Sequence, residues 1–144
     1  YSGYTEGWAL YTESLGKELG LYTDPYQYFG MLSMEMHRAI RLVVDTGLHS
    51  KAWTRAQAIQ YSLDNEAETE DSIVSEIERY MANPGQALSY KIGQLKIREL
   101  RAKSTKVLGD KFDVKGFHNQ VVTTGSIPLY LLEGKIDNWI DSNK

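Results

Sequence analysis

The fold class of this chain is decided by residues 24–50, DPYQYFGMLSMEMHRAIRLVVDTGLHS. Asp24 is a favoured N-cap residue, and Pro25 occupies the first helical position, where its missing N–H costs nothing. The apolar residues that follow cover most of the circumference of a helix, so we expect a long helix that other helices enclose. Gly47 is expected to end this helix.

The rest of the chain consists of shorter amphipathic segments separated by brief Gly, Pro or Asn/Asp breaks. Thr5, Thr54, Asp113 and Ser126 stand where helices should begin, and each has a side-chain oxygen suited to capping. No run of alternating β-branched residues predicts a strand. We therefore predict a single all-α domain over residues 1–144, with about seven helices packed as an orthogonal or bundle-like array.

The composition excludes several kinds of partner and site. The formal net charge of -3 gives no electrostatic support for binding nucleic acid or an anionic membrane. No stretch approaches the ~18 consecutive apolar residues of a membrane span. Cysteine is absent, and no two of the three histidines have the four-residue spacing that presents paired imidazoles to a metal. The chain opens Tyr-Ser-Gly-Tyr without Met or a leader, so we expect either a processed product or an excised piece of a larger protein.

Residues 4–13, YTEGWALYTE, contain the first candidate site residue. Glu6 lies at the start of the predicted helix and away from its apolar stripe. By spacing alone, Glu6 does no more than complement the helix dipole, and Glu13 is placed to pair with Lys17 four residues on. The pattern leaves both a structural and a functional role open.

Polar residues interrupt the apolar surface of the long helix. Arg38, Arg41 and Asp45 are three and four residues apart and so share one face, and His49 lies just beyond Gly47. On an enclosed helix such charges must be paired or line a cavity, because an unpaired buried charge costs several kcal/mol. An internal salt-bridge network and an exposed helix face are the alternatives to a functional site.

A third group of candidates surrounds a turn within residues 79–90, RYMANPGQALSY. The break at Pro84-Gly85 ends one helix and starts another, whose first N–H groups lack helical partners. These N–H groups and the hydroxyl of Tyr90 could together stabilise an oxyanion. The alternative is an ordinary helical hairpin with Tyr90 in the core.

Three strings, taken together, resemble one known family: TEGWALYTESLGKELGLYTDP, RAIRLVVDTGLH and ERYMANPGQALSYKIGQLKIRELR, at residues 5–25, 38–49 and 78–101. In this order, over nearly the whole chain, they resemble the bacterial domain of unknown function 885 family. The combination of EGWALY, VVDTGLH and PGQALSY is specific, whereas each motif alone is not.

The resemblance implies a zincin-like helical fold similar to thimet oligopeptidase and neurolysin, zinc peptidases that bind the metal through HExxH and a downstream Glu. The family carries an HExxPGHH-like motif before EGWALY, so Glu6 would be the third zinc ligand. Tyr90 would donate to the oxyanion, with His49 as a second catalytic residue. The residues implied in substrate binding or in orienting ligands are Arg38, Arg41, Asp45, Tyr80 and Gln86.

No HExxH occurs among the 144 residues. We therefore expect zinc in the intact protein, none in this chain alone, and no activity of this chain alone. The predicted function is that of the C-terminal helical part of a zinc-dependent metallopeptidase-like hydrolase; the alternative is a non-catalytic helical module that binds a peptide or protein.

The partners expected on this basis are the N-terminal remainder of the same protein and a peptide substrate. Apolar surface that the remainder would normally cover could also pair two copies as a homodimer. Since relatives look exported, an exported or periplasmic location in a bacterium is expected.

Overall fold

The computed structural model describes residues 1–144 and contains helices but no strands. The seven α-helices are α1 (Ser2–Glu18), α2 (Pro25–Ser50), α3 (Arg55–Asn65), α4 (Glu70–Ala82), α5 (Ser89–Leu108), α6 (Val114–Val122) and α7 (Leu129–Asn143). Short 3₁₀ turns, Gln86–Leu88 and Gly109–Lys111, precede and follow α5. The predicted all-α fold of about seven helices is confirmed. None of these helices combines the length and apolarity that crossing a membrane requires.

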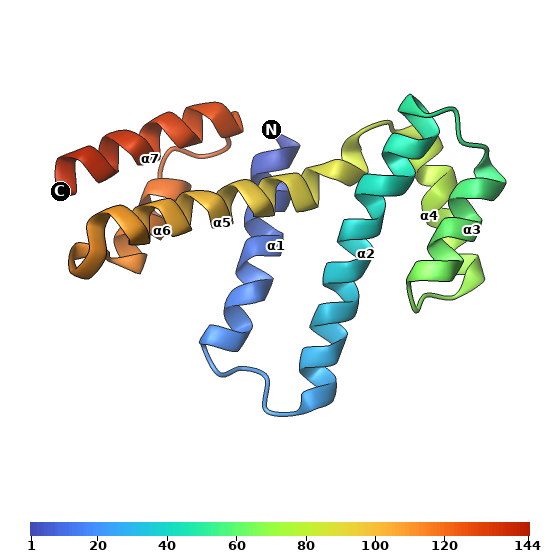
Figure 1. The fold of residues 1–144 in the computed structure, drawn as a ribbon, viewed down its shortest axis with the longest axis horizontal. Coiled ribbons are helices and arrows are strands. Elements are labelled where there is room, and N and C mark those ends of the chain that lie inside the picture. Colours follow the sequence, from blue (N-terminus) through green and yellow to red (C-terminus); the bar gives the residue numbers. More distant parts are fainter.

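The helices form two groups, each around its own core, as Figure 1 shows. α1, α5, α6 and α7 enclose one cluster of ten buried residues, and α2, α3, α4 and the turn before α5 enclose another of eight. The long α5 crosses α1, its closest neighbour, and its N-terminal end reaches α2 (Figure 1). α1 and α2 run antiparallel and touch each other little. The N-terminal part of α5 therefore lies close to both α1 and α2.

Three of the predicted helix caps are present. Asp24 accepts a hydrogen bond from the N–H of Tyr26 at 2.6 Å, directly before Pro25. Thr54 forms a capping box at the start of α3, and the carboxylate of Asp113 caps α6. These caps depend on side chains and backbone within three residues, so local sequence was sufficient to predict them.

Three boundary predictions were wrong. α1 begins at Ser2 rather than after Thr5. α7 begins at Leu129, directly after Pro128, and Ser126 does not cap it; the Ser126 hydroxyl instead donates to the Tyr1 carbonyl at 3.4 Å. Gly47 lies inside α2, where a Cβ would come within 2.5 Å of the Trp53 ring. This glycine allows ring packing and does not end the helix.

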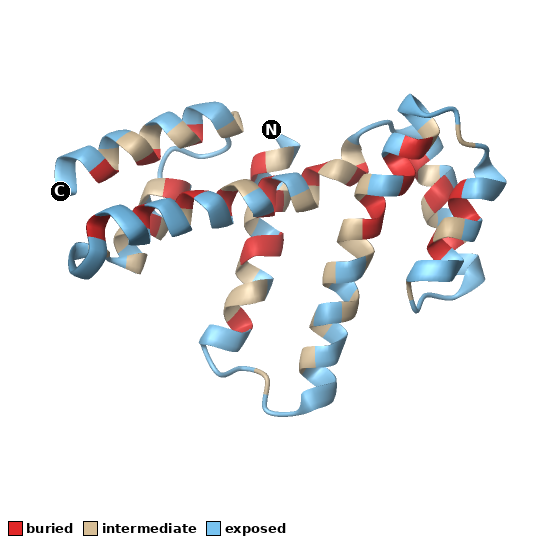
Figure 2. Ribbon diagram, in the orientation of Figure 1, coloured by how far each residue is buried: buried red, intermediate tan, exposed pale blue.

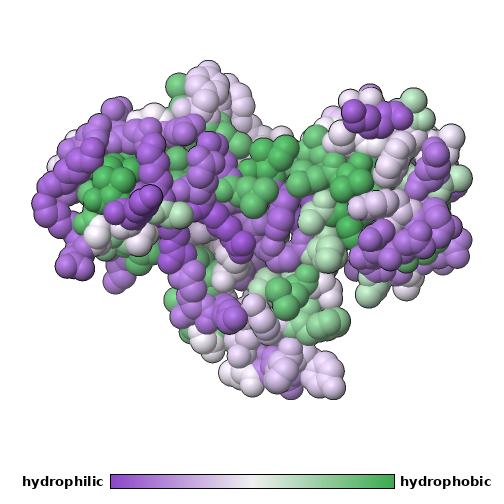
Figure 3. Space-filling view, viewed as in Figure 1, coloured by the Kyte–Doolittle hydropathy of each residue, from purple (hydrophilic) through white to green (hydrophobic).

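The prediction that α2 is enclosed by other helices was also wrong for the first half of the helix. Buried positions occur only from Ile40 to Gly47, and Figure 2 shows the earlier turns exposed or partly exposed. Apolar side chains reach the surface along this half, as the green atoms of Figure 3 show. They are Tyr26, Phe29, Leu32, Met34 and Met36.

Candidate functional site

A crossing built on three glycines holds the first turns of α1 against the first turns of α5. A Cβ added to Gly93 would lie 1.8 Å from the carbonyl oxygen of Gly3 and 2.6 Å from the Cα of Gly7. The two backbones are thus in contact, and no larger side chain fits between them. Glu6 lies next to this crossing on α1, and Tyr90 lies one turn before it on α5. The crossing sets the positions of both predicted site residues.

Glu6 is a half-buried carboxylate in the first turns of α1. None of the chain's hydrogen bonds or ion pairs uses its oxygens, although side chains nearby on the same helix are bonded. Lys17 contacts the hydroxyl of Tyr28 at 3.2 Å and forms no ion pair with Glu13. The Glu13–Lys17 pair that the spacing allowed is therefore absent. Glu6 is therefore a fixed acidic group with unused acceptor oxygens.

The ring of Tyr90 lies against two arginines of α2. The guanidinium carbon of Arg38 is 4.6 Å from the ring centre and that of Arg41 is 5.0 Å away, which are cation–π distances. Tyr90 is partly exposed, and no hydrogen bond within the chain engages its hydroxyl. The phenol is thus free to donate to a bound molecule.

Arg41 belongs to a charged cluster centred on Glu76 of α4. The Glu76 carboxylate accepts from Arg41 Nη2 at 2.5 Å, from the Tyr80 hydroxyl at 2.6 Å, and from Nε and Nη2 of Arg79 at 3.0 Å. Burial opposes ionisation of Glu76, but the hydrogen bonds from Arg79 and Tyr80 and the charge of Arg41 outweigh it and lower its pKa to about 2. Burial, and then the bond to Glu76, raise the pKa of Tyr80 well above its usual value.

Asp45, His49 and Gln86 connect this cluster to the turn before α5. The Asp45 carboxylate accepts from the Gly85 N–H at 3.1 and 3.2 Å. Nε2 of His49 donates to the Tyr80 carbonyl at 2.9 Å, and Oε1 of Gln86 accepts from Arg79 Nη1 at 2.9 Å. All three side chains therefore hold the helix connection in place.

The same contacts reduce the number of free amides at the turn. The Gly85 N–H is bound by Asp45, the Gln86 N–H by the Asn83 carbonyl at 3.4 Å, and the Leu88 N–H by the Gly85 carbonyl at 3.3 Å. The hydroxyl of Tyr90 is therefore a better candidate donor for an oxyanion than these backbone groups.

Arg38 differs from its neighbours because it pairs with no carboxylate. Burial and then the charge of Arg41 lower the pKa of Arg38, while Glu13 on α1 favours its charged form. Glu13 follows Glu6 by seven residues, about two helical turns, so both carboxylates lie on the same side of α1. The acidic side of α1 thus faces the arginines of α2.

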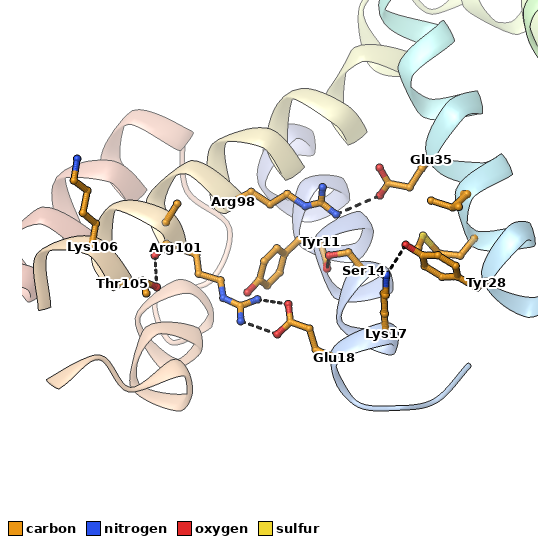
Figure 4. A pocket seen from close by; sticks show the side chains of 13 residues that line it. Tyr11, Ser14, Lys17, Glu18, Tyr28, Glu35, Arg98, Arg101, Thr105 and Lys106 are labelled. Carbon is orange, nitrogen blue, oxygen red and sulfur yellow. Dashed lines mark hydrogen bonds and ion pairs between the residues drawn. The ribbon is translucent and has the colours of Figure 1, made fainter. Parts of the chain in front are cut away.

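A pocket between α1, α2 and α5 lies apart from these residues (Figure 4). Its volume is about 760 Å³. Arg101 binds Glu18 through two bonds of 2.7 Å there, and Arg98 lies 3.8 Å from Glu35. Because these charges neutralise one another, we place the candidate site at Tyr90 and the arginines of α2.

The 144 residues contain no group of three His, Cys, Asp or Glu side chains arranged to hold a metal ion. Zinc requires three protein ligands in a catalytic site. The unused carboxylate of Glu6 fits one of them, and the chain does not supply the other two.

The structure brings four of the predicted site residues to the junction of α1, α2 and α5: Glu6, Arg38, Arg41 and Tyr90. The other four, Asp45, His49, Tyr80 and Gln86, lie on the α4 side of this junction. Sequence reasoning missed Glu76 and Arg79, although their spacing with Tyr80, three and four residues, places all three on one helix face.

These features define a helical module in which a carboxylate, a free phenol and two arginines flank a glycine crossing. The chain belongs to the family described as "Bacterial protein of unknown function (DUF885)", which matches residues 1–136. A solved structure described as "the putative lipoprotein from Colwellia psychrerythraea" is 52% identical, with a TM-score of 0.96, over 99% of this chain and 24% of that one. The chain therefore spans about a quarter of that protein's length. No curated protein matches it.

Proposed function

We propose that this chain is the C-terminal helical part of a zinc-dependent metallopeptidase-like hydrolase and is inactive without the rest of the protein. The observation that carries the proposal is Glu6, a half-buried carboxylate with no partner in the chain, fixed beside a backbone crossing. Such an acid suits a metal ligand whose companions come from other residues of the protein. The EGWALY motif that contains Glu6 lies within residues 1–136, the part of the chain that the family matches.

Each residue of the site has a role in this proposal. Glu6 supplies one carboxylate ligand. Zinc, when bound, would lower the pKa of a water molecule toward about 7. The Tyr90 hydroxyl donates to the oxyanion that develops when a peptide carbonyl is attacked. Arg38 and Arg41 orient the substrate, and Asp45 and His49 hold the turn that positions Tyr90.

The metal content of the intact protein and of the 144-residue chain tests the proposal. Both would be purified in the same way and analysed by elemental mass spectrometry. We expect near one zinc per intact chain and none per 144-residue chain. Hydrolysis of a peptide library by the intact protein should stop when a chelator is added. Hydrolysis that is indifferent to chelator would contradict the proposal.

A second candidate is a non-catalytic helical module that binds a peptide or protein. The exposed apolar side chains of α2 favour it, because such surfaces commonly mark interaction sites. No metal in either protein, even after zinc is supplied, would favour this candidate.

We further propose that the intact protein is exported. The solved relative is described as a "putative lipoprotein", and a bacterial lipoprotein is carried out of the cytoplasm. Fractionation of cells that produce the intact protein should place it outside the cytoplasmic fraction.

A further inference from the structure

Arg41 is a buried arginine with unused hydrogen-bond donors. Its residue is 5% exposed, and its Nη2 binds Glu76. Its Nε and Nη1 are buried without any hydrogen-bond partner. An unsatisfied buried donor on a charged group costs more than the ~1–3 kcal/mol of a neutral one. These two N–H groups therefore indicate an acceptor that the chain itself does not supply.

Neighbouring carboxylates cannot readily supply that acceptor. Glu76 already accepts from Arg41, Arg79 and Tyr80. Asp45 is engaged by the amide of Gly85. Both carboxylates are therefore already engaged, and Glu13 on α1, whose charge acts on Arg38, forms no ion pair with either arginine.

Arg38 extends this unpaired positive charge toward the surface. Like Arg41, it lies against the Tyr90 ring, it is only partly buried, and no ion pair engages it. Two guanidinium groups held by one aromatic ring, one buried and one accessible, form a fork that matches a planar oxyanion.

We propose that Arg38 and Arg41, which lie against the Tyr90 ring, bind the carboxylate of a peptide, so that the intact protein acts on peptides held by a free carboxyl group. This inference rests on the proposed peptidase function for its substrate class, whereas the carboxylate site itself rests only on the donors described. In this proposal the carboxylate accepts from Arg38, which is partly exposed. The unused donors of Arg41 are sealed from solvent, so the Tyr90 ring must shift for the carboxylate to reach them.

The test compares N-acetylated dialanine with its C-terminal amide, using the intact protein and isothermal titration calorimetry. We expect the acid to bind at least about tenfold more tightly than the amide, since a charge-assisted hydrogen bond contributes about 1.5–3 kcal/mol. Arg38→Gln should remove this preference, so that the variant binds the acid no more tightly than the amide. Equal binding of acid and amide would overturn the proposal.

Arg41 requires a milder variant, because its loss leaves Glu76 with one fewer partner. Arg41→Lys keeps a cation for Glu76 but removes the planar donors, and it should also reduce the preference for the acid about tenfold. The matched control is Arg55→Gln, which breaks an exposed pair with Glu78 on the far side of α4 and should change neither affinity. An effect of the control as large as that of Arg38→Gln would overturn the assignment.

Two further ligands identify the source of the carboxylate. An amidated peptide with a glutamate side chain reports on internal acids, and inorganic phosphate reports on a general anion site. Binding of either as tightly as the peptide acid would overturn the proposal.

Hydrolysis of the same acid and amide pair separates this inference from the peptidase proposal. Binding of the acid that depends on Arg38, without any hydrolysis, would support the carboxylate site and count against the peptidase. Hydrolysis of acid and amide at equal rates would support the peptidase and overturn the carboxylate site.

Discussion

Glu6 can act as a metal ligand or as an acid that merely complements the dipole of α1. Replacing it by Gln keeps the shape of the side chain and removes one carboxylate. In the intact protein we expect Glu6→Gln to change the unfolding free energy by less than about 1 kcal/mol, the usual size of a helix-dipole interaction. Zinc affinity should fall by about 10-fold to 100-fold or more. Thermal unfolding and elemental mass spectrometry measure the two effects.

Glu13→Gln is the matched control for this substitution. Glu13 lies on the same side of α1, two turns further on, and is exposed. The control should leave zinc content unchanged. Full zinc occupancy in Glu6→Gln would mean that the ligand assignment is wrong.

Glu76 makes the stability of the chain depend on pH. Its pKa falls from 4.5 to about 2 in the folded state, so its contribution to stability is fully present above pH 4.5 and is lost as the pH falls from about 5 to about 2. The side chain is 26% exposed, so we discount the full shift and expect a loss of about 2 kcal/mol. Urea unfolding of the 144-residue chain between pH 7 and pH 3 measures this loss.

Glu76→Gln should lower the unfolding free energy at pH 7 by about 2–4 kcal/mol, because it leaves Arg41 with no charged partner. It should also flatten the dependence on pH. Glu78→Gln, on the same helix, breaks only an exposed pair with Arg55 and should cost less than about 1 kcal/mol. Equal losses from the two variants would contradict a central role for Glu76.

The sequence could identify some of these residues and not others. Arg38 and Arg41 could be selected because charges on an apolar helix are unusual. Glu76, the partner of Arg41, is 35 positions from it in the sequence and lies in an acidic segment that looks solvated, so nothing local distinguishes it. For Asp45 and His49, contacts with the turn before α5 became evident only from the fold.

At the scale of the element, the crossing of α1 and α5 depends on Gly93. A methyl group there would meet backbone atoms of Gly3 and Gly7, which cannot rotate away. We expect Gly93→Ala to lower the unfolding free energy by about 2–3 kcal/mol or more, because the helices must separate. Urea unfolding of the 144-residue chain measures this loss.

Gly30→Ala is the control, since Gly30 lies within α2 and a Cβ there meets nothing within 4 Å. It should raise the unfolding free energy by about 0.5–1 kcal/mol, as removal of glycine from a helix interior does. If neither variant changed the unfolding free energy, the close backbone contact at the crossing would not contribute to stability.

The elements themselves were largely predictable because their signals are local. Asp24, Thr54 and Asp113 cap helices with side chains that reach only two or three residues ahead. Gly47 and Ser126 failed as boundary signals because Trp53 and Tyr1 engage them through tertiary contacts. A glycine required for packing and one required for a turn look the same in sequence.

At the scale of the whole molecule, α2 carries more apolar side chains than this chain buries. The pattern predicted an enclosed helix, yet the turns before Ile40 have no covering helix within the 144 residues. The solved relative is about four times as long as this chain, which covers 24% of it. The exposed apolar residues of this half have the spacing of a buried helix face. This spacing is consistent with a covering surface supplied by the rest of such a protein.

Phe29, Leu32 and Met36 form one stripe on this half of α2, three and four residues apart, and are 63%, 45% and 53% exposed. Because burying this stripe is favourable, we expect the 144-residue chain to self-associate. Light scattering should give a mass that rises with concentration above the 16.4 kDa of the monomer.

Leu32→Glu places a charge within the stripe and should shift the chain toward monomer. Gln27→Glu adds the same charge on an exposed polar residue of α2 and should not. A mass of one monomer at every concentration would mean that the stripe does not drive association between copies, so a cover from the rest of the protein would need other contacts to hold it.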